Sequence, residues 1–149
     1  MKLKQLVVSI ENSPGRLYQV TAALGEAGIN LRALNLVDTG EFGQLRLLVS
    51  DISKARRILM QLQLPAFINE VVAVLIPDVP KSLANILGPL NDAGVYVTSM
   101  YSFIGFAKQD KAVMIFRFTD NDKAIEVLQK SNVTILDAKA FGILETGGA

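Results

Sequence analysis

The fold is decided by the stretch LVVSIENSPGRL at positions 6–17. Its apolar half, Leu6–Ile10, is short and rich in β-branched residues, which predicts a strand. The polar half, Asn12–Gly15, has the chemistry of a turn that starts a helix, with Ser13 available as N-cap and Pro14 suited to the first helical position. The stretch therefore predicts a strand, a turn and the beginning of a helix.

The residues that follow complete one structural unit. Apolar residues recur at helical spacing up to a stop at Gly28: Leu17, Val20, Leu24 and Ala27. Strands are expected at Asn30–Val37, Gln44–Val49 and Ile68–Ile76. A second helix, capped by Asp51 or Ser53, precedes the last of these strands. This order of elements favours a four-stranded antiparallel sheet with both helices on one face.

The chain contains this unit twice. Leu6–Leu17 aligns with Val72–Leu83, 66 positions later, and after three added residues the match resumes 69 positions later, where Asp51 aligns with Asp120. Pro, Gly and Asp recur at these fixed offsets, which favours a duplicated unit over chance. The second copy is expected to have helices at Leu83–Ala93 and Lys123–Gln129 and strands at Val95–Phe103, Ala112–Phe118 and Ala138–Leu144.

The boundary between the copies is a strand and not a linker. We expect units at residues 1–70 and 71–149, yet the strand at 68–76 matches both the last strand of one copy and the first strand of the other. Either one long or bent strand serves both units, or Phe141–Leu144 is exchanged to complete the first sheet.

Two strands of the second copy are apolar on both sides of the pleat: Val72–Ile76 and Ala112–Phe116. Such strands are buried on both faces. The helices of a unit cover only one face, so the other copy or a second chain must cover the other. This pattern favours paired units and a homodimer.

The composition excludes several classes of protein. The 149 residues include no His and no Cys, which excludes disulfides, thiolate nucleophiles, zinc fingers and Ser-His-Asp triads. A net charge of +1 argues against nucleic acid as a partner. No apolar run reaches the roughly 18 residues that span a bilayer, and Leu6–Ile10 is too short for a signal peptide. We therefore expect a cytoplasmic protein without a membrane partner.

The first copy resembles the ACT domain, whose signature is a strand, an N-x-P-G turn, an amphipathic helix and a G-[IV]-N-[IL] entry into the next strand. Asn12–Gly15 and Gly28–Leu31 match these two motifs. The resemblance extends to both copies and implies an α+β protein of two ferredoxin-like units. It also implies that the units pair and bind small molecules, usually amino acids, at their interface to regulate metabolism.

The resemblance places a ligand loop at Asn12, Ser13, Pro14 and Gly15, and a second polar contact, from a paired unit, at Asn30. The backbone N–H groups of Gly15 and Arg16 would lie at a helix N-terminus, which stabilises a ligand carboxylate. The amides of Asn12 and Asn30 could hold an amino group and a carboxylate. Alternatively, Asn12 and Ser13 only cap the helix and Asn30 only ends a turn.

The second copy departs from this pattern. Asp78 stands in place of Asn12, Lys81 in place of Gly15, and Tyr96 in place of Asn30. The second site is therefore degenerate, binds a different ligand, or complements the first by placing Tyr96 or Met100–Phe103 against its ligand. The alternative for this aromatic segment is core packing.

Three classes of function remain: a ligand-binding regulator, a structural subunit that docks onto a metabolic enzyme, and an enzyme. No carboxylate pair has general acid/base spacing, and no phosphate-binding glycine loop is present. We expect a regulatory protein without catalytic activity, metal or cofactor. Its expected ligand is an amino acid, bound by Asn12, Ser13, Pro14, Gly15, Arg16, Asn30, Asp78 and Tyr96.

Overall fold

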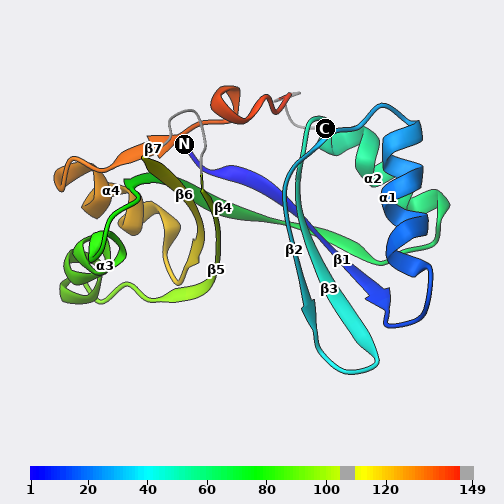
Figure 1. Cartoon of the computed structure of the whole chain (residues 1–149), viewed down its shortest axis with the longest axis horizontal. Helices are drawn as coiled ribbons and strands as arrows, with labels where there is room; N and C mark the ends of the chain where they lie inside the picture. Colours follow the sequence, from blue (N-terminus) through cyan, green and yellow to red (C-terminus); the bar gives the residue numbers. More distant parts are fainter. Residues whose placement is uncertain (105–109, 145–149) are drawn as a thin grey trace. The chain divides into compact units, whose positions relative to one another are not determined.

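The computed structural model describes residues 1–104 and 110–144, which form two compact units (Figure 1). Lys4–Asn69, together with the C-terminal segment that starts at Ala138, forms what we call the first unit. Met1–Leu3 and Glu70–Asp137 form the second unit. Each unit is described by itself below.

The first unit is a sheet with two helices on one face (Figure 1). Its elements are β1 (Leu3–Glu11), α1 (Arg16–Glu26), β2 (Leu31–Asp38), β3 (Phe42–Val49), α2 (Ile52–Gln61) and the start of β4 (Ala66–Pro77). The strand order is β2-β3-β1-β4, and β3 pairs antiparallel with both β1 and β2. The residues that follow Asn30 therefore form the edge strand β2.

The second unit repeats this arrangement. Its elements are the rest of β4, α3 (Ser82–Asp92), β5 (Val97–Ile104), β6 (Lys111–Phe118), α4 (Asn121–Lys130) and β7 (Thr134–Leu136). The strand order is β7-β4-β6-β5, with antiparallel pairing throughout. The repeat predicted from the sequence is confirmed, because α1 and α3 start 66 positions apart, and β3 and β6 start 69 positions apart.

Strand β4 runs without a break from Ala66 to Pro77, and its residues up to Asn69 belong to the first unit while those from Glu70 belong to the second. The expected strand at Ala138–Leu144 is wrong. A short 3₁₀-helix, η1 (Lys139–Phe141), lies there instead.

The outer edge of β4 in the second unit is already paired with β7, so the segment after Asp137 has no edge of that sheet to join. It lies in the first unit, where the Leu144 N–H donates to the Ser50 carbonyl oxygen at 2.8 Å and Leu144 forms a single parallel bridge with Asp51. The Arg32 Nε donates to the Gly142 carbonyl oxygen at 3.3 Å.

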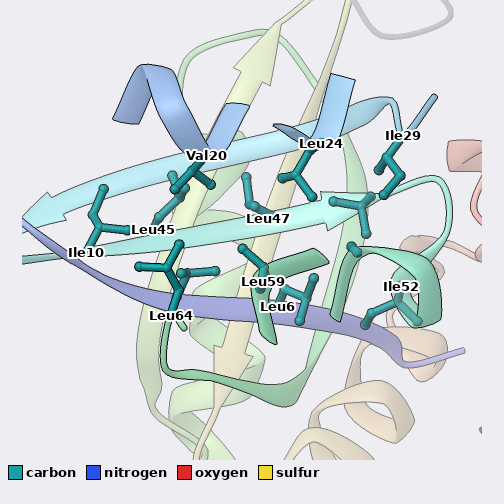
Figure 2. Packing of buried hydrophobic residues seen from close by; sticks show 13 residues of the cluster. Leu6, Ile10, Val20, Leu24, Ile29, Leu45, Leu47, Ile52, Leu59 and Leu64 are labelled. Carbon is teal, nitrogen blue, oxygen red and sulfur yellow. The ribbon is translucent and has the colours of Figure 1, made fainter. Parts of the chain in front are cut away.

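The core of the first unit lies between the sheet and its helices (Figure 2). Leu6, Leu45 and Leu47 of the strands meet Val20 and Leu24 of α1 and Leu59 of α2, all inaccessible to solvent. In the second unit, Val113, Met114, Ile115 and Phe116 of β6 are consecutive and all buried. Both faces of β6 are therefore covered, as the sequence predicts.

Lys2 near the N-terminus forms ion pairs with two acidic residues of the second unit. The Lys2 Nζ lies 2.9 Å from Asp122 Oδ1 and 3.8 Å from Glu70 Oε1. The hydrogen bond to Asp122 and the charge of Glu70 raise the pKa of Lys2 above its ordinary value. Because these groups are solvent-exposed, the pairs add little stability.

We expect Asp51→Ala to lower the free energy of unfolding by about 1 kcal/mol. The Asp51 Oδ1 accepts a hydrogen bond from the Lys54 N–H at 3.1 Å and caps α2, so its loss leaves a helix N–H without its protein partner. Urea denaturation followed by circular dichroism measures the change. Asp51→Asn is the matched control and should keep most of the stability, since Asn caps equally well. Equal losses in both variants would show that the carboxylate charge matters and the cap does not.

Candidate functional site

The turn between β1 and α1 is held to the β2–β3 connection by Asn12. Its N–H donates to the Glu41 carbonyl oxygen at 2.8 Å, and its Nδ2 donates to the Gly40 carbonyl oxygen at 3.3 Å. The side-chain Oδ1 of Asn12 accepts no hydrogen bond from the described residues. The amide oxygen therefore stays available to a ligand.

The cap interpretation of this turn is wrong. Gly15, with φ of 81°, is the N-cap residue of α1, and no side chain caps the helix. The helix consequently begins at Arg16 and not at Pro14. Within the described residues, the N–H groups of Gly15, Leu17 and Tyr18 have no hydrogen-bond partner, while the Arg16 N–H donates to the Ser13 carbonyl oxygen at 3.3 Å. Free N–H groups at a helix N-terminus favour an anionic group there.

A cavity of about 220 Å³ lies beside this turn. The lining residues are Ile10, Glu11, Asn12, Ser13, Leu17, Leu36, Asp38 and Gly43. Of the expected ligand residues, Asn12 and Ser13 line it, whereas Pro14, Gly15 and Arg16 do not. The Arg16 Nη1 donates to Gln19 Oε1 at 2.6 Å, and its buried Nε has no partner among the described residues.

Asn30 lies at the other end of the same sheet. Glu11, next to Asn12, pairs with Phe42 at the start of β3, whereas Leu31, next to Asn30, pairs with Val49 at its end. Phe42 and Val49 are seven residues apart along β3, a separation of about 23 Å. The structure therefore does not bring Asn12 and Asn30 of this unit together. The Asn30 N–H donates to Ser50 Oγ at 2.9 Å.

The second unit has the same turn with different side chains. The Asp78 N–H donates to the Asp110 carbonyl oxygen at 2.8 Å, as Asn12 does to Glu41. Lys81 is the N-cap residue of α3 and has φ of 75°, close to that of Gly15. Tyr96 lies at the opposite end of the sheet, where its N–H donates to Thr119 Oγ1 at 3.2 Å.

A cavity of about 630 Å³ lies beside this second turn. The lining residues are Ile76, Pro77, Asp78, Val79, Lys81, Ser82, Leu83, Ala84, Leu87, Met100, Ser102, Ala112 and Met114. Asp78 is thus placed at a cavity and Tyr96 is not. Ile76, Asp78 and Leu83 follow Ile10, Asn12 and Leu17 by 66 positions, so the two cavities are copies of one site.

Most of the apolar wall residues of both cavities were missed by sequence reasoning. Leu36 of β2 lines the first cavity, although it looked like an ordinary strand residue. Met100 of β5 lines the second cavity and belongs to the segment that the sequence offered either as a ligand contact or as core. Of the segment Met100–Phe103, Met100 and Ser102 line the second cavity, while Tyr101 and Phe103 alternate to the opposite face of β5. The register of the repeat aligns Leu36 with Ser102, which also lines the second cavity, and Met100 lies two positions before Ser102 on the same strand face.

The polar groups at these sites suit binding. Amide, hydroxyl and carboxylate groups recognise a polar molecule through hydrogen bonds. Within residues 1–104 and 110–144, no cluster of three acidic side chains is placed to hold a metal ion. In the same part of the chain, none of the helices has the length and apolarity needed to cross a membrane.

Comparison with known proteins identifies the family. The model of the ACT domain pair matches residues 1–144. A crystal structure of a protein from Bacteroides thetaiotaomicron is 40% identical, with a TM-score of 0.89, and the match covers 97% of this chain and 98% of that chain. No curated protein matches.

Two regulatory subunits of aspartate kinase share the fold. The subunit from Thermus flavus is 15% identical with a TM-score of 0.62 over 95% of each chain. The ligand-free subunit from Thermus thermophilus is 15% identical with a TM-score of 0.61, over 86% of this chain and 91% of that chain. The chain belongs to the family of ACT domain pairs, and the predicted fold of two ferredoxin-like units is confirmed. This class of protein is regulatory.

Proposed function

We propose that the protein is a non-catalytic regulator that binds an amino acid at the turn between the first strand and the first helix of an ACT unit. The observation that carries this proposal is the cavity beside Asn12, which recurs beside Asp78. A binding site is concave and has a few polar groups among apolar ones, and both cavities fit this description.

The first cavity offers groups for both ends of an amino acid. The carboxylates of Glu11 and Asp38 and the free Oδ1 of Asn12 suit an ammonium group. The N–H group of Leu17, which lines the cavity at the N-terminus of α1 and has no hydrogen-bond partner among the described residues, suits a carboxylate. We propose that Asn30 of a paired unit in a homodimer supplies a further contact, and that the protein works in the cytoplasm.

A second candidate function is that of a structural subunit without a ligand. Leu34 and Leu36 on the edge strand β2 are 53% and 46% exposed. Exposed apolar side chains on an unpaired strand edge favour contact with another protein. The partner we propose, a metabolic enzyme, fits the likeness to the aspartate kinase regulatory subunits.

A thermal-shift panel of the twenty amino acids at millimolar concentration tests binding. A ligand at about 100 times its Kd should add roughly 2.7 kcal/mol to the free energy of unfolding. For a ligand in the first cavity, Asn12→Ala should abolish the shift, because Asn12 lines that cavity and holds the turn.

The control is Asn91→Ala, on an exposed position of α3, which should leave the shift unchanged. Asn12→Ala should cost the ligand-free protein less than about 1 kcal/mol, since the Asn12–Gly40 hydrogen bond is exposed. A larger loss in the ligand-free protein would identify Asn12 as a structural residue. A panel without any shift would favour the structural subunit.

A further inference from the structure

Helix α2 of the first unit carries an unbalanced positive charge. Its charged residues are Lys54, Arg56 and Arg57, and it contains no acidic residue. The corresponding helix of the second unit, α4, has two residues of each sign: Asp122, Glu126, Lys123 and Lys130. Arg57 aligns with Glu126 at the offset of 69 positions, so the charge at this place of the repeat is reversed.

The positive charge lies on the side of α2 that faces away from the core. Ala55 and Leu59 are inaccessible to solvent and belong to the core of the first unit, whereas the three basic residues are exposed. Met60 follows the arginines by one helical turn, and its side chain is 71% exposed. Among residues 1–104 and 110–144, none of the three basic side chains makes an ion pair. We call this surface the basic face of α2: Lys54, Arg56, Arg57 and Met60.

The basic face does not serve the stability of its own helix. The N-terminus of a helix has a partial positive charge, which favours acidic residues in the first turn and basic residues in the last turn. Helix α4 follows this rule, with Asp122 in its first turn and Lys130 in its last turn. Helix α2 has no such residues, and Lys54 lies in its first turn instead. Basic residues that the helix dipole disfavours point to an interaction outside the helix.

The chemistry of this face favours an acidic protein segment over nucleic acid or lipid. Arg and Met are enriched where proteins meet, and the exposed Met60 offers an apolar contact beside the arginines. Nucleic acid is bound by a basic excess and by stacking aromatic rings, but the net charge of the chain is +1 and α2 has no aromatic residue. A lipid surface takes up the apolar face of a helix, and that face of α2 already lies in the core.

We infer that the basic face of α2 is a docking surface for an acidic segment of a partner protein that also presents an apolar side chain. The two arginines and Lys54 pair with carboxylates of the partner, and Met60 contacts its apolar side chain. In the second unit, Glu126 stands in place of Arg57, so α4 does not bind such a segment. Docking at this face goes beyond the proposed amino-acid binding, because it requires no ligand in either cavity.

Fluorescence anisotropy on the full chain tests docking with a labelled glutamate-rich peptide that contains leucines. The wild type should bind this peptide, and binding should weaken as salt is added, because the attracting charges are exposed. The double variant Arg56→Glu, Arg57→Glu should bind at least about tenfold more weakly, since two attractive pairs become repulsive. Met60→Gln introduces the residue that α4 has at this place, and should weaken binding about threefold because it removes the apolar contact.

A matched pair of variants separates binding from folding. Lys54 and Lys123 occupy the same place in α2 and α4, and the N–H of each donates to the Asp that caps its helix, at 3.1 and 3.0 Å. Lys54→Glu puts a carboxylate in the first turn of α2, so it should raise the melting temperature by about 1 to 3 °C and yet weaken peptide binding about threefold. Lys123→Glu changes the net charge of the chain equally and should leave peptide binding unchanged.

Three other outcomes would overturn the inference. Equal losses of binding in Lys54→Glu and Lys123→Glu would show that the peptide responds to the net charge of the chain and not to α2. Unchanged binding in Met60→Gln, or tighter binding of duplex DNA or of phosphatidylserine vesicles than of the peptide, would identify a surface for any polyanion. A change in the mass of the chain in solution, caused by the double arginine variant, would mean that the basic face joins copies of this chain.

The amino-acid panel distinguishes docking from the proposed function. The double arginine variant should give the same thermal shifts as the wild type, because neither arginine lines either of the two cavities. If the wild type shows shifts but does not bind the peptide, docking is refuted and the proposed function stands. If it binds the peptide and shows no shifts, docking stands and the proposed amino-acid site is refuted.

Discussion

Phe116→Ala is expected to lower the free energy of unfolding by about 3 to 5 kcal/mol. Phe116 lies on the central strand β6 and is inaccessible to solvent. Its ring stacks on that of Phe118, with 5.0 Å between centroids. The smaller side chain leaves a cavity in a core that cannot collapse to fill it. Urea denaturation monitored by circular dichroism gives the value.

Phe67→Ala is the matched control for Phe116→Ala. Phe67 also lies on a strand, β4, but is 55% exposed, so its truncation should change the free energy of unfolding by no more than about 0.5 kcal/mol. A loss of that small size for Phe116→Ala as well would mean that the core of the second unit repacks around the missing ring.

The repeat made most of the fold predictable. A segment with a weak pattern could be interpreted with its copy. Asp51 was one of two candidate caps of the second helix, Asp120 aligns with it, and both residues cap a helix. The segment from Ala138 to Leu144 was misjudged because its apolar pattern does not say which sheet has a free edge. Three residues of β7 already occupy the edge of β4, and that fact depends on tertiary structure.

The polar residues of the candidate site were accessible to sequence reasoning because turns have their own chemistry. Asn12 and Ser13 belong to the turn motif, Asp78 aligns with Asn12 in the repeat, and all three line a cavity. Most of the apolar wall residues were not accessible, because Leu17, Leu87 and similar residues have the spacing of a helix core. Such a residue lines a cavity only because an edge strand lies beside the helix, and that arrangement depends on tertiary structure.

The position of Ala73 in the shared strand β4 makes Ala73→Pro a severe change. Ala73 is inaccessible to solvent and lies between Ile115 of β6 and Leu136 of β7. Proline has no N–H for the ladder and is excluded from central strands, so we expect a loss of about 3 kcal/mol or more. That is a large part of the about 5 to 15 kcal/mol that stabilises a typical domain.

Because β4 continues into the first unit, the damage should reach residues that do not contact Ala73. Amide signals of Leu47 in the first unit and of Met114 in the second can be followed by two-dimensional NMR as urea is added. In Ala73→Pro, the native amide signals of Leu47 and of Met114 should both disappear at a lower urea concentration than in the wild type. Ala73→Gly, which keeps the N–H, should cost only about 1 kcal/mol. If the Leu47 signal keeps its wild-type midpoint while that of Met114 is lost, the first unit folds without an intact second unit, and the shared strand does not couple them.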